Sequence, residues 1–305
     1  MKTAILCPGQ GAQHVGMGKD FYQAHAAARQ VFDQADETLG YSISRLCFEG
    51  PENQLQATDH AQVGIFVTSV AIYRTLESIE KLPTNVDVLA GLSLGEYTAL
   101  HIAGALRFAD GLKLVQARGQ LMQAAALARP GSMLALVGAD DTAAQAIAQA
   151  STDAGVIVCA NFNAPGQVVL SGSMEACHKA AQVAQERGFR AVQLSVAGAF
   201  HSPLMAEAAT KMAGILDDTP IANPKIPVIS NVTATPHHDV PSIRRLLVEQ
   251  IVSPVKWAQS MRWLLTDGVK DFHELGPGRT LTGLMKKIDR QAQVKNISTA
   301  LGLSL

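Results

Sequence analysis

One serine of the sequence stands where its hydroxyl could attack a carbonyl carbon. Ser93 is the centre of Gly91-Leu92-Ser93-Leu94-Gly95, a run that follows an apolar stretch and precedes a helix-like one. In such a Gly-x-Ser-x-Gly turn the serine is held out from the backbone, because the glycines remove side chains that would collide there. A serine at a helix start also serves as an N-cap. The pattern therefore leaves two roles open for Ser93, the nucleophile of an acyl-transfer reaction or a helix cap.

A serine hydroxyl is a poor nucleophile until a neighbouring base takes its proton, and histidine has the pKa for that near neutrality. The chain contains nine histidines. Only His201 lies in a loop where the chain leaves a predicted strand and returns to the main body of the protein, so we expect His201 to be the base. No aspartate stands out as the third member of a triad.

Two further segments offer groups for a reacting acyl chain. The loop Pro8-Gly9-Gln10-Gly11-Ala12-Gln13 ends the first predicted strand and offers backbone N–H groups free of ladder partners, as an oxyanion hole requires. Its spacing fits neither the phosphate-binding P-loop nor the full dinucleotide fingerprint. Arg118 lies in a helical stretch among apolar residues, and from the residues alone we expect it to be solvated or ion-paired.

The elements that must position these groups alternate along the chain. Strands are predicted at 3–7, 86–90, 226–232 and 269–275, and helices at 21–39, 61–82, 97–106, 111–127, 242–250, 255–266 and 281–288. Strands that alternate with helices indicate a parallel sheet in an α/β fold.

A different pattern interrupts this alternation between residues 130 and 197. Strands at 132–137, 156–160, 167–171 and 191–194 and helices at 141–150 and 174–187 follow the order βαββαβ of a ferredoxin-like unit. The segment Asn161-Phe162-Asn163-Ala164-Pro165-Gly166 joins the middle strands and is predicted to be a turn whose amides could also meet a ligand. We therefore expect a ferredoxin-like subdomain at 130–197, inserted into a larger catalytic subdomain of residues 1–129 and 198–305.

The composition limits the classes of function. The 305 residues carry 25 basic and 26 acidic side chains and are 48% hydrophobic, which is typical of a soluble globular protein and gives no electrostatic footprint for nucleic acid. The apolar runs are too short to span a bilayer, and the start lacks the apolar region of a signal peptide, so we expect a cytoplasmic protein without membrane partners. The cysteines have no metal-ligand spacing and are expected to be buried free thiols: Cys7, Cys47, Cys159 and Cys177.

Taken together, these residues resemble the malonyl-CoA:acyl carrier protein transacylases and the related acyltransferase domains of polyketide synthases. The resemblance covers nearly the whole chain and rests on ordered blocks: Pro8-Gly9-Gln10-Gly11, residues 91–97, Arg118-Gly119 with Met122, residues 161–169, Phe200-His201-Ser202, Asn231-Val232, Gln250 before Pro254-Val255-Lys256-Trp257, and Gly276-Pro277-Gly278 before Leu281-Thr282-Gly283-Leu284. It implies that the large subdomain is α/β-hydrolase-like.

The resemblance implies a ping-pong transfer of a malonyl group from malonyl-CoA to the phosphopantetheine thiol of an acyl carrier protein, with no cofactor and no metal. Ser93 would be the nucleophile and His201 the base. The main-chain carbonyl of Gln250, rather than a carboxylate, would orient the histidine ring. The backbone N–H groups of Gln10 and Leu94 would hold the oxyanion.

The resemblance also assigns residues that select the substrate. Arg118 would bind the free carboxylate of the malonyl group, which reverses the expectation from the residues alone. Phe200 indicates malonyl rather than methylmalonyl, and Asn163 would also bind substrate. Leu92 stands where the family usually has histidine and would make that wall of the acyl pocket apolar.

Alternatives remain for the partner surface and for the reaction. Carrier proteins of this kind are typically acidic, so the basic cluster Lys286, Lys287 and Arg290 is expected either to dock the carrier or to be a solvated helix face. A hydrolase that releases the acyl group to water would use the same Ser93 and His201, whereas a non-catalytic scaffold would need neither. We expect a monomer that serves either fatty acid or polyketide synthesis.

Overall fold

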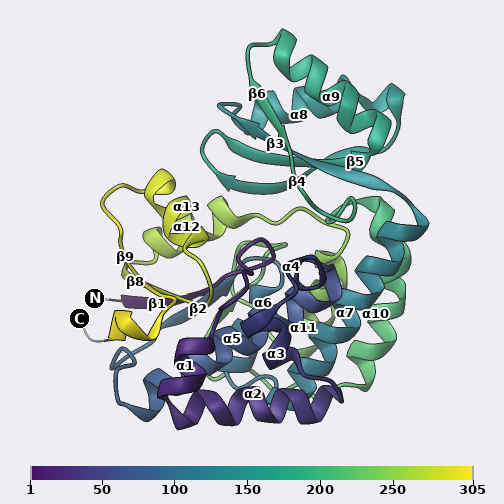
Figure 1. The fold of residues 1–305 in the computed structure, drawn as a ribbon. Helices are drawn as coiled ribbons and strands as arrows, with labels where there is room; N and C mark the ends of the chain where they lie inside the picture. Colours follow the sequence, from purple (N-terminus) through teal and green to yellow (C-terminus); the bar gives the residue numbers. More distant parts are fainter. Residues whose placement is uncertain (1, 304–305) are drawn as a thin grey trace.

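The structure is a computed structural model that describes residues 2–303, and it contains two sheets in two bodies (Figure 1). The larger body contains a five-stranded sheet whose strands lie in the order β7 (Val228–Ile229), β2 (Val88–Gly91), β1 (Lys2–Cys7), β8 (Val269–Leu275) and β9 (Gln293–Ile297). The smaller body stands on the end of the larger one where α7 (Phe108–Ala128) finishes.

The five-stranded sheet is parallel throughout and is buried on both faces. In the central strand, Ile5 and Cys7 face one apolar core, whereas Ala4 and Leu6 face the other, and all four are fully buried. A parallel strand covered on both sides is expected to be apolar at consecutive positions rather than at alternate ones. The predicted parallel α/β architecture is therefore confirmed.

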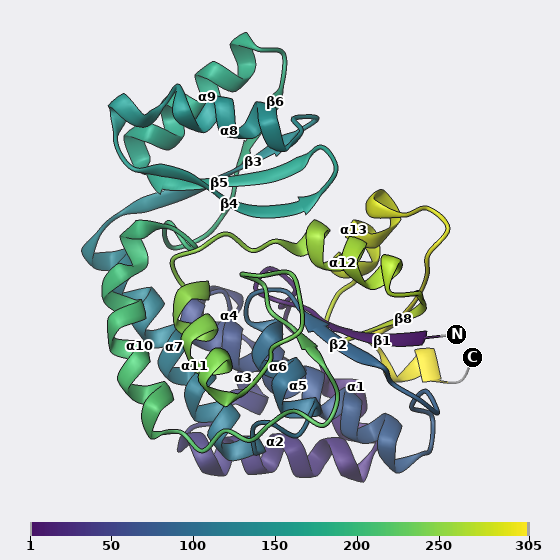
Figure 2. The ribbon, with the colours of Figure 1, turned by 180° about the vertical axis from the view of Figure 1, so that it is seen from behind.

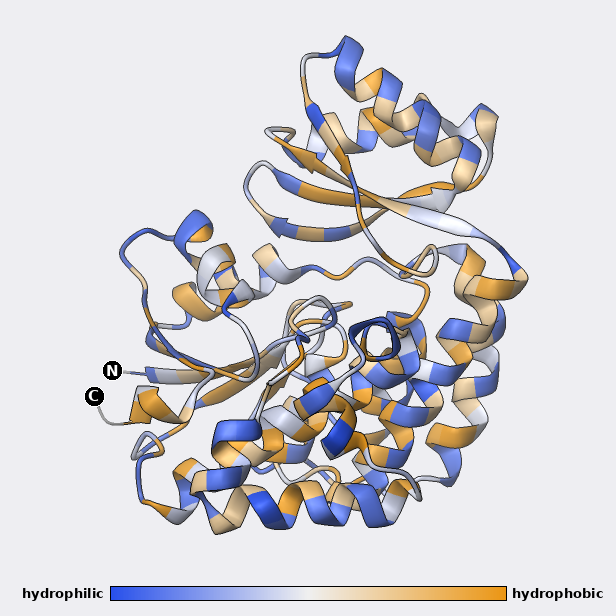
Figure 3. Ribbon diagram, in the orientation of Figure 1, coloured by the Kyte–Doolittle hydropathy of each residue, from blue (hydrophilic) through white to orange (hydrophobic). Residues whose placement is uncertain are grey.

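Helices cover the two faces of this sheet. The larger core lies under α7 and under α1 (Lys19–Ala24), α2 (Ala26–Leu39), α3 (Ile43–Glu49), α4 (Glu52–Leu55), α5 (Thr58–Ser78), α6 (Gly95–Ile102), α10 (Ala206–Asp218) and α11 (Val240–Gln250). The other face packs against α12 (Trp257–Thr266) and α13 (Thr280–Ile288). Figure 2 shows α7, α10 and α11 side by side. Figure 3 shows α2 striped with polar and apolar residues, as expected for a helix with one face on the core.

The smaller body has its own apolar core under an antiparallel sheet. Its strands lie in the order β4 (Ile157–Ala164), β5 (Gln167–Ser173), β3 (Gly131–Val137) and β6 (Arg190–Gln193), and its helices are α8 (Asp141–Gln149) and α9 (Met174–Glu186). The order βαββαβ along the chain is thus present, and the predicted ferredoxin-like unit is confirmed.

Two predictions at the junction of the bodies are wrong, because strand pairing on β4 overrides the local preference of both segments. Residues 161–164 continue β4 and pair with β5 instead of forming a turn, so the chain reverses only at Pro165-Gly166. Val255 pairs with β4 instead of starting a helix: it accepts from the N–H of Phe162 at 2.9 Å and donates to the carbonyl of Ala160 at 2.8 Å. This pairing ties the smaller sheet to the larger body and delays α12 until Trp257.

Other elements also differ from the prediction. The helix predicted at 21–39 breaks at His25, whose backbone is extended. The strand predicted at 226–232 is reduced to Val228–Ile229, an edge strand that pairs with β2 and forms one isolated bridge from Ile229 to Pro236. The elements α3, α10 and β9 are not among those predicted.

The four cysteines are free and buried, as predicted. Within residues 2–303, no helix has the length and apolar character needed to cross a bilayer.

Candidate active site

Ser93 lies on a tight turn between β2 and α6, with a left-handed backbone (φ 52°). Close packing excludes side chains from the glycines on either side. A Cβ on Gly91 would lie 1.9 Å from the carbonyl carbon of Gly95, and one on Gly95 would lie 2.1 Å from the carbonyl oxygen of Cys7. The Ser93 hydroxyl caps no helix, since Leu94 occupies the N-cap position of α6. The turn has the geometry of a nucleophile elbow.

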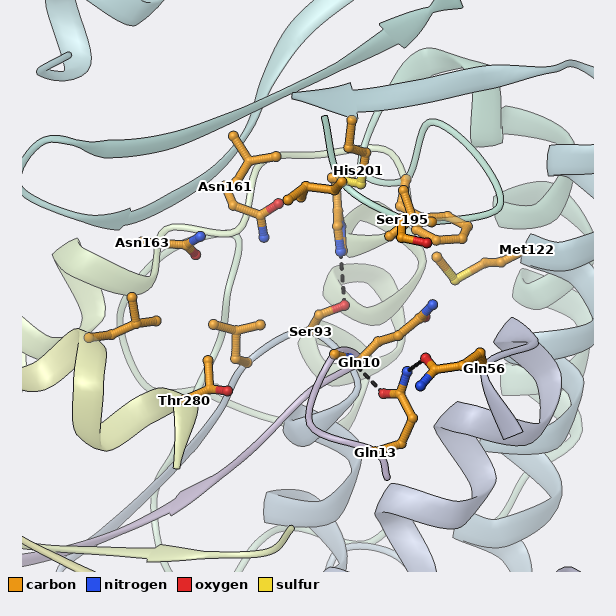
Figure 4. A pocket seen from close by; sticks show the side chains of 18 of the residues that line it. Gln10, Gln13, Gln56, Ser93, Met122, Asn161, Asn163, Ser195, His201 and Thr280 are labelled. Atoms are coloured by element: carbon orange, nitrogen blue, oxygen red, sulfur yellow. Dashed lines mark hydrogen bonds between the residues drawn. The ribbon is translucent and has the colours of Figure 1, made fainter. Parts of the chain in front are cut away.

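His201 follows β6 and points its ring at Ser93 (Figure 4). Its Nε2 lies 2.8 Å from Ser93 Oγ, and its Nδ1 lies 2.8 Å from the main-chain carbonyl oxygen of Gln250. Because a carbonyl oxygen can only accept, Nδ1 carries the proton and Nε2 is left to accept the proton of the serine. The base is therefore oriented by a backbone group and not by a carboxylate.

The surroundings of His201 keep its ring neutral. Burial, and secondly the positive charge of Arg118, lower the pKa of His201 from 6.5 to about 4. A general base must be unprotonated before it can act, so this environment holds His201 ready over the whole range near neutrality.

Arg118 is 1% exposed, although it carries a positive charge. Its Nη1 donates to Gln62 Oε1 at 2.6 Å, and its Nη2 donates to Ser93 Oγ at 3.0 Å and to Gln250 Oε1 at 2.9 Å. The guanidinium carbon also lies 5.5 Å from the ring centroid of Tyr97. The expectation of a solvated or ion-paired arginine is wrong, since these partners within residues 2–303 are uncharged. A buried cation with neutral partners is suited to bind an incoming carboxylate.

Two backbone amides near Ser93 are available to an oxyanion. The loop that contains Gln10 packs directly on the elbow, because a Cβ on Gly9 would lie 2.3 Å from the carbonyl oxygen of Leu92. Within residues 2–303, the N–H groups of Gln10 and Leu94 donate to no other group. Free N–H groups beside a nucleophile can stabilise the negative charge of a tetrahedral intermediate.

A cavity of about 370 Å³ opens onto Ser93 (Figure 4). Six of the eight predicted site residues line it, namely Gln10, Ser93, Arg118, Asn163, Phe200 and His201. The other two, Leu94 and Gln250, are fully buried. Leu92 lines the cavity as well, and Figure 4 shows Asn161 and Asn163 on one side of His201 and Met122 on the other. The cavity is thus partly lined by amides and partly by apolar side chains.

Three polar side chains around the elbow have roles that sequence reasoning did not assign. Gln62 binds Arg118, Asn231 accepts from the N–H of Ser93 at 2.6 Å, and Glu96 binds both Asn231 and Gln250. All three are at most 2% exposed. The available signal was a polar residue inside an otherwise apolar stretch, as for Gln62 between Ala61 and Val63.

Known proteins resemble this chain over nearly its whole length. Residues 5–303 match the family model described as an acyl transferase domain. The malonyl CoA-acyl carrier protein transacylase of Bacillus subtilis is 42% identical over 299 residues, which cover 97% of this chain and 93% of that protein. The crystal structure of an acyl carrier protein S-malonyltransferase from Vibrio cholerae superposes with a TM-score of 0.95 at 37% identity, and the match covers 100% of this chain and 99% of that one. A malonyl-transacylase in complex with its type II polyketide synthase acyl carrier protein gives a TM-score of 0.95 at 35% identity, with 100% and 98% of the chains covered.

Proposed function

The chain belongs to the acyl transferase family, among its malonyl CoA-acyl carrier protein transacylases, and on this premise we propose which of its residues carry out the transfer. The protein is an acyl carrier protein S-malonyltransferase, which moves a malonyl group from malonyl-CoA to the phosphopantetheine thiol of an acyl carrier protein. The observation that carries the proposed roles is the contact of Ser93 Oγ with both His201 Nε2 and the buried cation of Arg118.

In the first half-reaction, Ser93 Oγ attacks the thioester carbonyl of malonyl-CoA while His201 Nε2 takes the hydroxyl proton. The carbonyl oxygen becomes an oxyanion, which the N–H groups of Gln10 and Leu94 stabilise. The C–S bond then breaks, His201 returns the proton to the departing sulfur, and CoA leaves as a thiol. The product is a malonyl ester of Ser93.

In the second half-reaction, the thiol of the carrier protein takes the place of CoA. His201 removes the thiol proton, the thiolate attacks the ester carbonyl, and the same N–H groups hold the new oxyanion. The C–O bond to Ser93 breaks as His201 gives the proton back to the serine oxygen. Serine, histidine and backbone amides carry every step, so the cycle needs no cofactor, and one chain supplies every group, as the expected monomer requires.

Arg118 selects the malonyl group in this proposal. The free carboxylate of malonyl is separated from the thioester carbonyl by a single methylene, and Arg118 Nη2 lies 3.0 Å from Ser93 Oγ. The guanidinium can therefore bind the carboxylate while the serine attacks. Phe200 closes the cavity against a branched acyl chain, and the side chain of Asn163, whose Oδ1 has no partner within residues 2–303, is free to bind substrate.

Intact-mass measurement tests the proposed function directly. The protein is mixed first with malonyl-CoA and then with an acyl carrier protein that bears its phosphopantetheine arm. We expect a mass increase of one malonyl group that is stable in buffer and is discharged by the carrier thiol. Discharge by water at the same rate without the carrier would favour the hydrolase, and no adduct at all would favour a scaffold.

The depressed pKa of His201 predicts an unusual pH profile. Since His201 loses its proton at a pKa of about 4, kcat/KM for malonyl-CoA should stay level from about pH 8 to about pH 5 and fall as pH drops through about 4. A stopped acylation assay across this range checks it, and a break near 6.5 would show that the base is not buried as described. The free energy of unfolding depends on pH in the same direction. The contribution of His201 to it is complete above the unfolded pKa of 6.5 and is lost as pH falls towards 4, because the unfolded state then binds the extra proton.

The basic cluster at the C-terminal end of α13 and just beyond it predicts the docking face of the carrier protein. Lys286, Lys287 and Arg290 are exposed, and α13 lines the cavity through Thr280 and Leu284. Lys287 also donates to Gln167 on the cavity wall, so the charge-reversal variant is Lys286→Glu with Arg290→Glu. We expect KM for an acidic carrier protein to rise by roughly tenfold and its salt dependence to flatten, because long-range attraction is lost.

Lys270→Glu is the matched control for this prediction. Lys270 is exposed near the start of β8, and the site lies at the opposite end of the strands, where β1 and β2 finish. The Lys270→Glu variant should leave KM for the carrier protein and KM for malonyl-CoA unchanged. An equal rise of KM for malonyl-CoA in the double variant would indicate that the cluster binds the phosphates of CoA instead.

We further propose residues 130 and 197 as the boundaries of the inserted subdomain and the cytoplasm as the location. The boundaries are supported by the position of β3 and β6, which begin and end the antiparallel sheet at Gly131 and Gln193. Expression of 130–197 alone, followed by a thermal melt, tests whether this segment folds independently.

A further inference from the structure

A buried carboxylate that the proposed mechanism does not use lies directly behind the active site. Glu96 is on α6 and is 0% exposed. Its Oε2 accepts from Gln250 Nε2 at 2.7 Å and from the N–H of Asn231 at 3.0 Å, and its Oε1 accepts from His237 Nε2 at 2.8 Å. Burial of a carboxylate costs free energy, and the three hydrogen bonds that Glu96 accepts offset this cost.

The hydrogen bond from Gln250 to Glu96 decides which way the side-chain amide of Gln250 faces. Its Nε2 donates to two acceptors, Glu96 Oε2 and, at 3.0 Å, the carbonyl oxygen of Ser93. Its Oε1 consequently faces Arg118 Nη2 at 2.9 Å. If the amide were reversed, its NH₂ would face the guanidinium, which has only donors, and its oxygen would face a carboxylate, which has only acceptors.

The second donor connects Glu96 to the nucleophile itself. Asn231 donates its backbone N–H to Glu96, while its side-chain Oδ1 accepts from the N–H of Ser93 at 2.6 Å and its Nδ2 donates to the carbonyl of Gly91 at 2.7 Å. Glu96 therefore holds both the residue that clamps the elbow and the residue that orients Arg118.

We propose that Glu96 is a positioning residue for the acyl-transfer site: by accepting from Gln250 and Asn231 it fixes the amide oxygen that orients Arg118 and the clamp that holds Ser93. The proposal rests on the proposed function, because Arg118 matters only if the acyl group carries a carboxylate. Glu96 touches no reacting atom and acts through these two residues.

Three substitutions at this position separate its possible contributions. Glu96→Gln retains the length and an oxygen that can accept from Gln250 and Asn231, and its cost falls on the His237 side, where a carboxylate oxygen becomes an NH₂ group. Glu96→Asp keeps the charge but shortens the side chain by one methylene and so withdraws both oxygens from their donors. Glu96→Ala removes the acceptor altogether and leaves the donors unpaired in a dry site.

The readout is the ratio of kcat/KM for malonyl-CoA to kcat/KM for acetyl-CoA, with transfer to the carrier protein measured for both. We expect the ratio to fall by about tenfold to a hundredfold in Glu96→Ala and Glu96→Asp, and to stay within about threefold of wild type in Glu96→Gln. If Glu96→Ala does not fold, the other two variants still test the proposal, which requires a higher ratio in Glu96→Gln than in Glu96→Asp. A ratio kept by Asp and lost by Gln would overturn the proposal in favour of a purely electrostatic role.

Leu100→Ala is the matched control for instability. Leu100 is on the same helix and is fully buried, but it has no polar contact to offer. It should lower the melting temperature and leave the selectivity ratio unchanged, and an equal fall of the ratio in this variant would also overturn the proposal. Wild-type protein that forms no malonyl adduct would refute the proposed function itself, whereas wild-type transfer with a ratio insensitive to position 96 would refute only the role of Glu96.

Discussion

Ser93→Ala is expected to abolish the malonyl adduct and to reduce transfer to the carrier protein on the order of a millionfold, the scale of loss when the nucleophile of a serine enzyme is removed. The physical reason is that the ester forms on Ser93 Oγ, the atom that contacts both His201 Nε2 and Arg118 Nη2. The fold should remain, because one oxygen is lost and the backbone of the elbow is held by Asn231. Intact mass after mixing with malonyl-CoA, together with a melting curve, measures both.

Ser195→Ala is the control for this variant. Ser195 also lines the cavity and is exposed there, but it makes no hydrogen bond to His201 within residues 2–303 (Figure 4). It should retain the adduct and most of the transfer rate. Malonyl labelling that persists in Ser93→Ala would mean that another nucleophile carries the acyl group.

Arg118→Ala is expected to reverse, or nearly reverse, the preference of the enzyme for malonyl-CoA over acetyl-CoA. Without the guanidinium, the malonyl carboxylate enters a buried site unpaired, a loss of about 3–5 kcal/mol. At 1.36 kcal/mol per decade, kcat/KM for malonyl-CoA should fall by roughly a hundredfold to several thousandfold. Acetyl-CoA has no carboxylate to leave unpaired. Its transfer should be unchanged or faster, since the charge of Arg118 also lowers the pKa of His201 and its removal makes the base stronger.

The measurement is kcat/KM for malonyl-CoA and acetyl-CoA side by side in wild type and variant. Arg107→Ala is the control, because Arg107 precedes the same helix but has a side chain that is 79% exposed and paired with Asp110. It should change neither value. Equal losses for both substrates in Arg118→Ala would show that Arg118 supports its helix and does not select the acyl group.

The fold could be predicted where one strong pattern decides the structure. The strand predicted at 269–275 is bounded by Gly268 and Gly276, and the structure places β8 over the same residues. The failures lie where strand pairing overrides local preference. Asn161, Asn163 and Gly166 favour a turn, but pairing with β5, together with the bridge to Val255 more than ninety residues away, keeps residues 161–164 in β4.

The candidate site could be predicted as a set of residue types but not as a set of contacts. Ser93 and its glycines are adjacent in sequence, and their turn chemistry is local. The burial of Arg118 is not local: it depends on Gln62 and Gln250 from two other helices, and no spacing along the chain encodes that meeting. No role for Glu96 could be predicted from the sequence, because a carboxylate beside an elbow has no visible partner until Asn231 and Gln250 fold back onto it.

The distances along the chain between these partners also set the order in which activity arises during synthesis. The hydrogen bonds from Ser93 to His201, from Arg118 to Gln250 and from Gln250 to Ser93 span 108, 132 and 157 residues. At a translation rate of 5–20 residues per second, 157 residues correspond to about 8–30 s between the emergence of the serine and that of the glutamine. The serine is without its base until 108 residues have followed it, and the arginine is without its amide partner until Gln250 emerges. A polypeptide that ends before Gln250 therefore lacks the carbonyl that orients His201 and the amide oxygen that orients Arg118, and we expect it not to consume cellular thioesters.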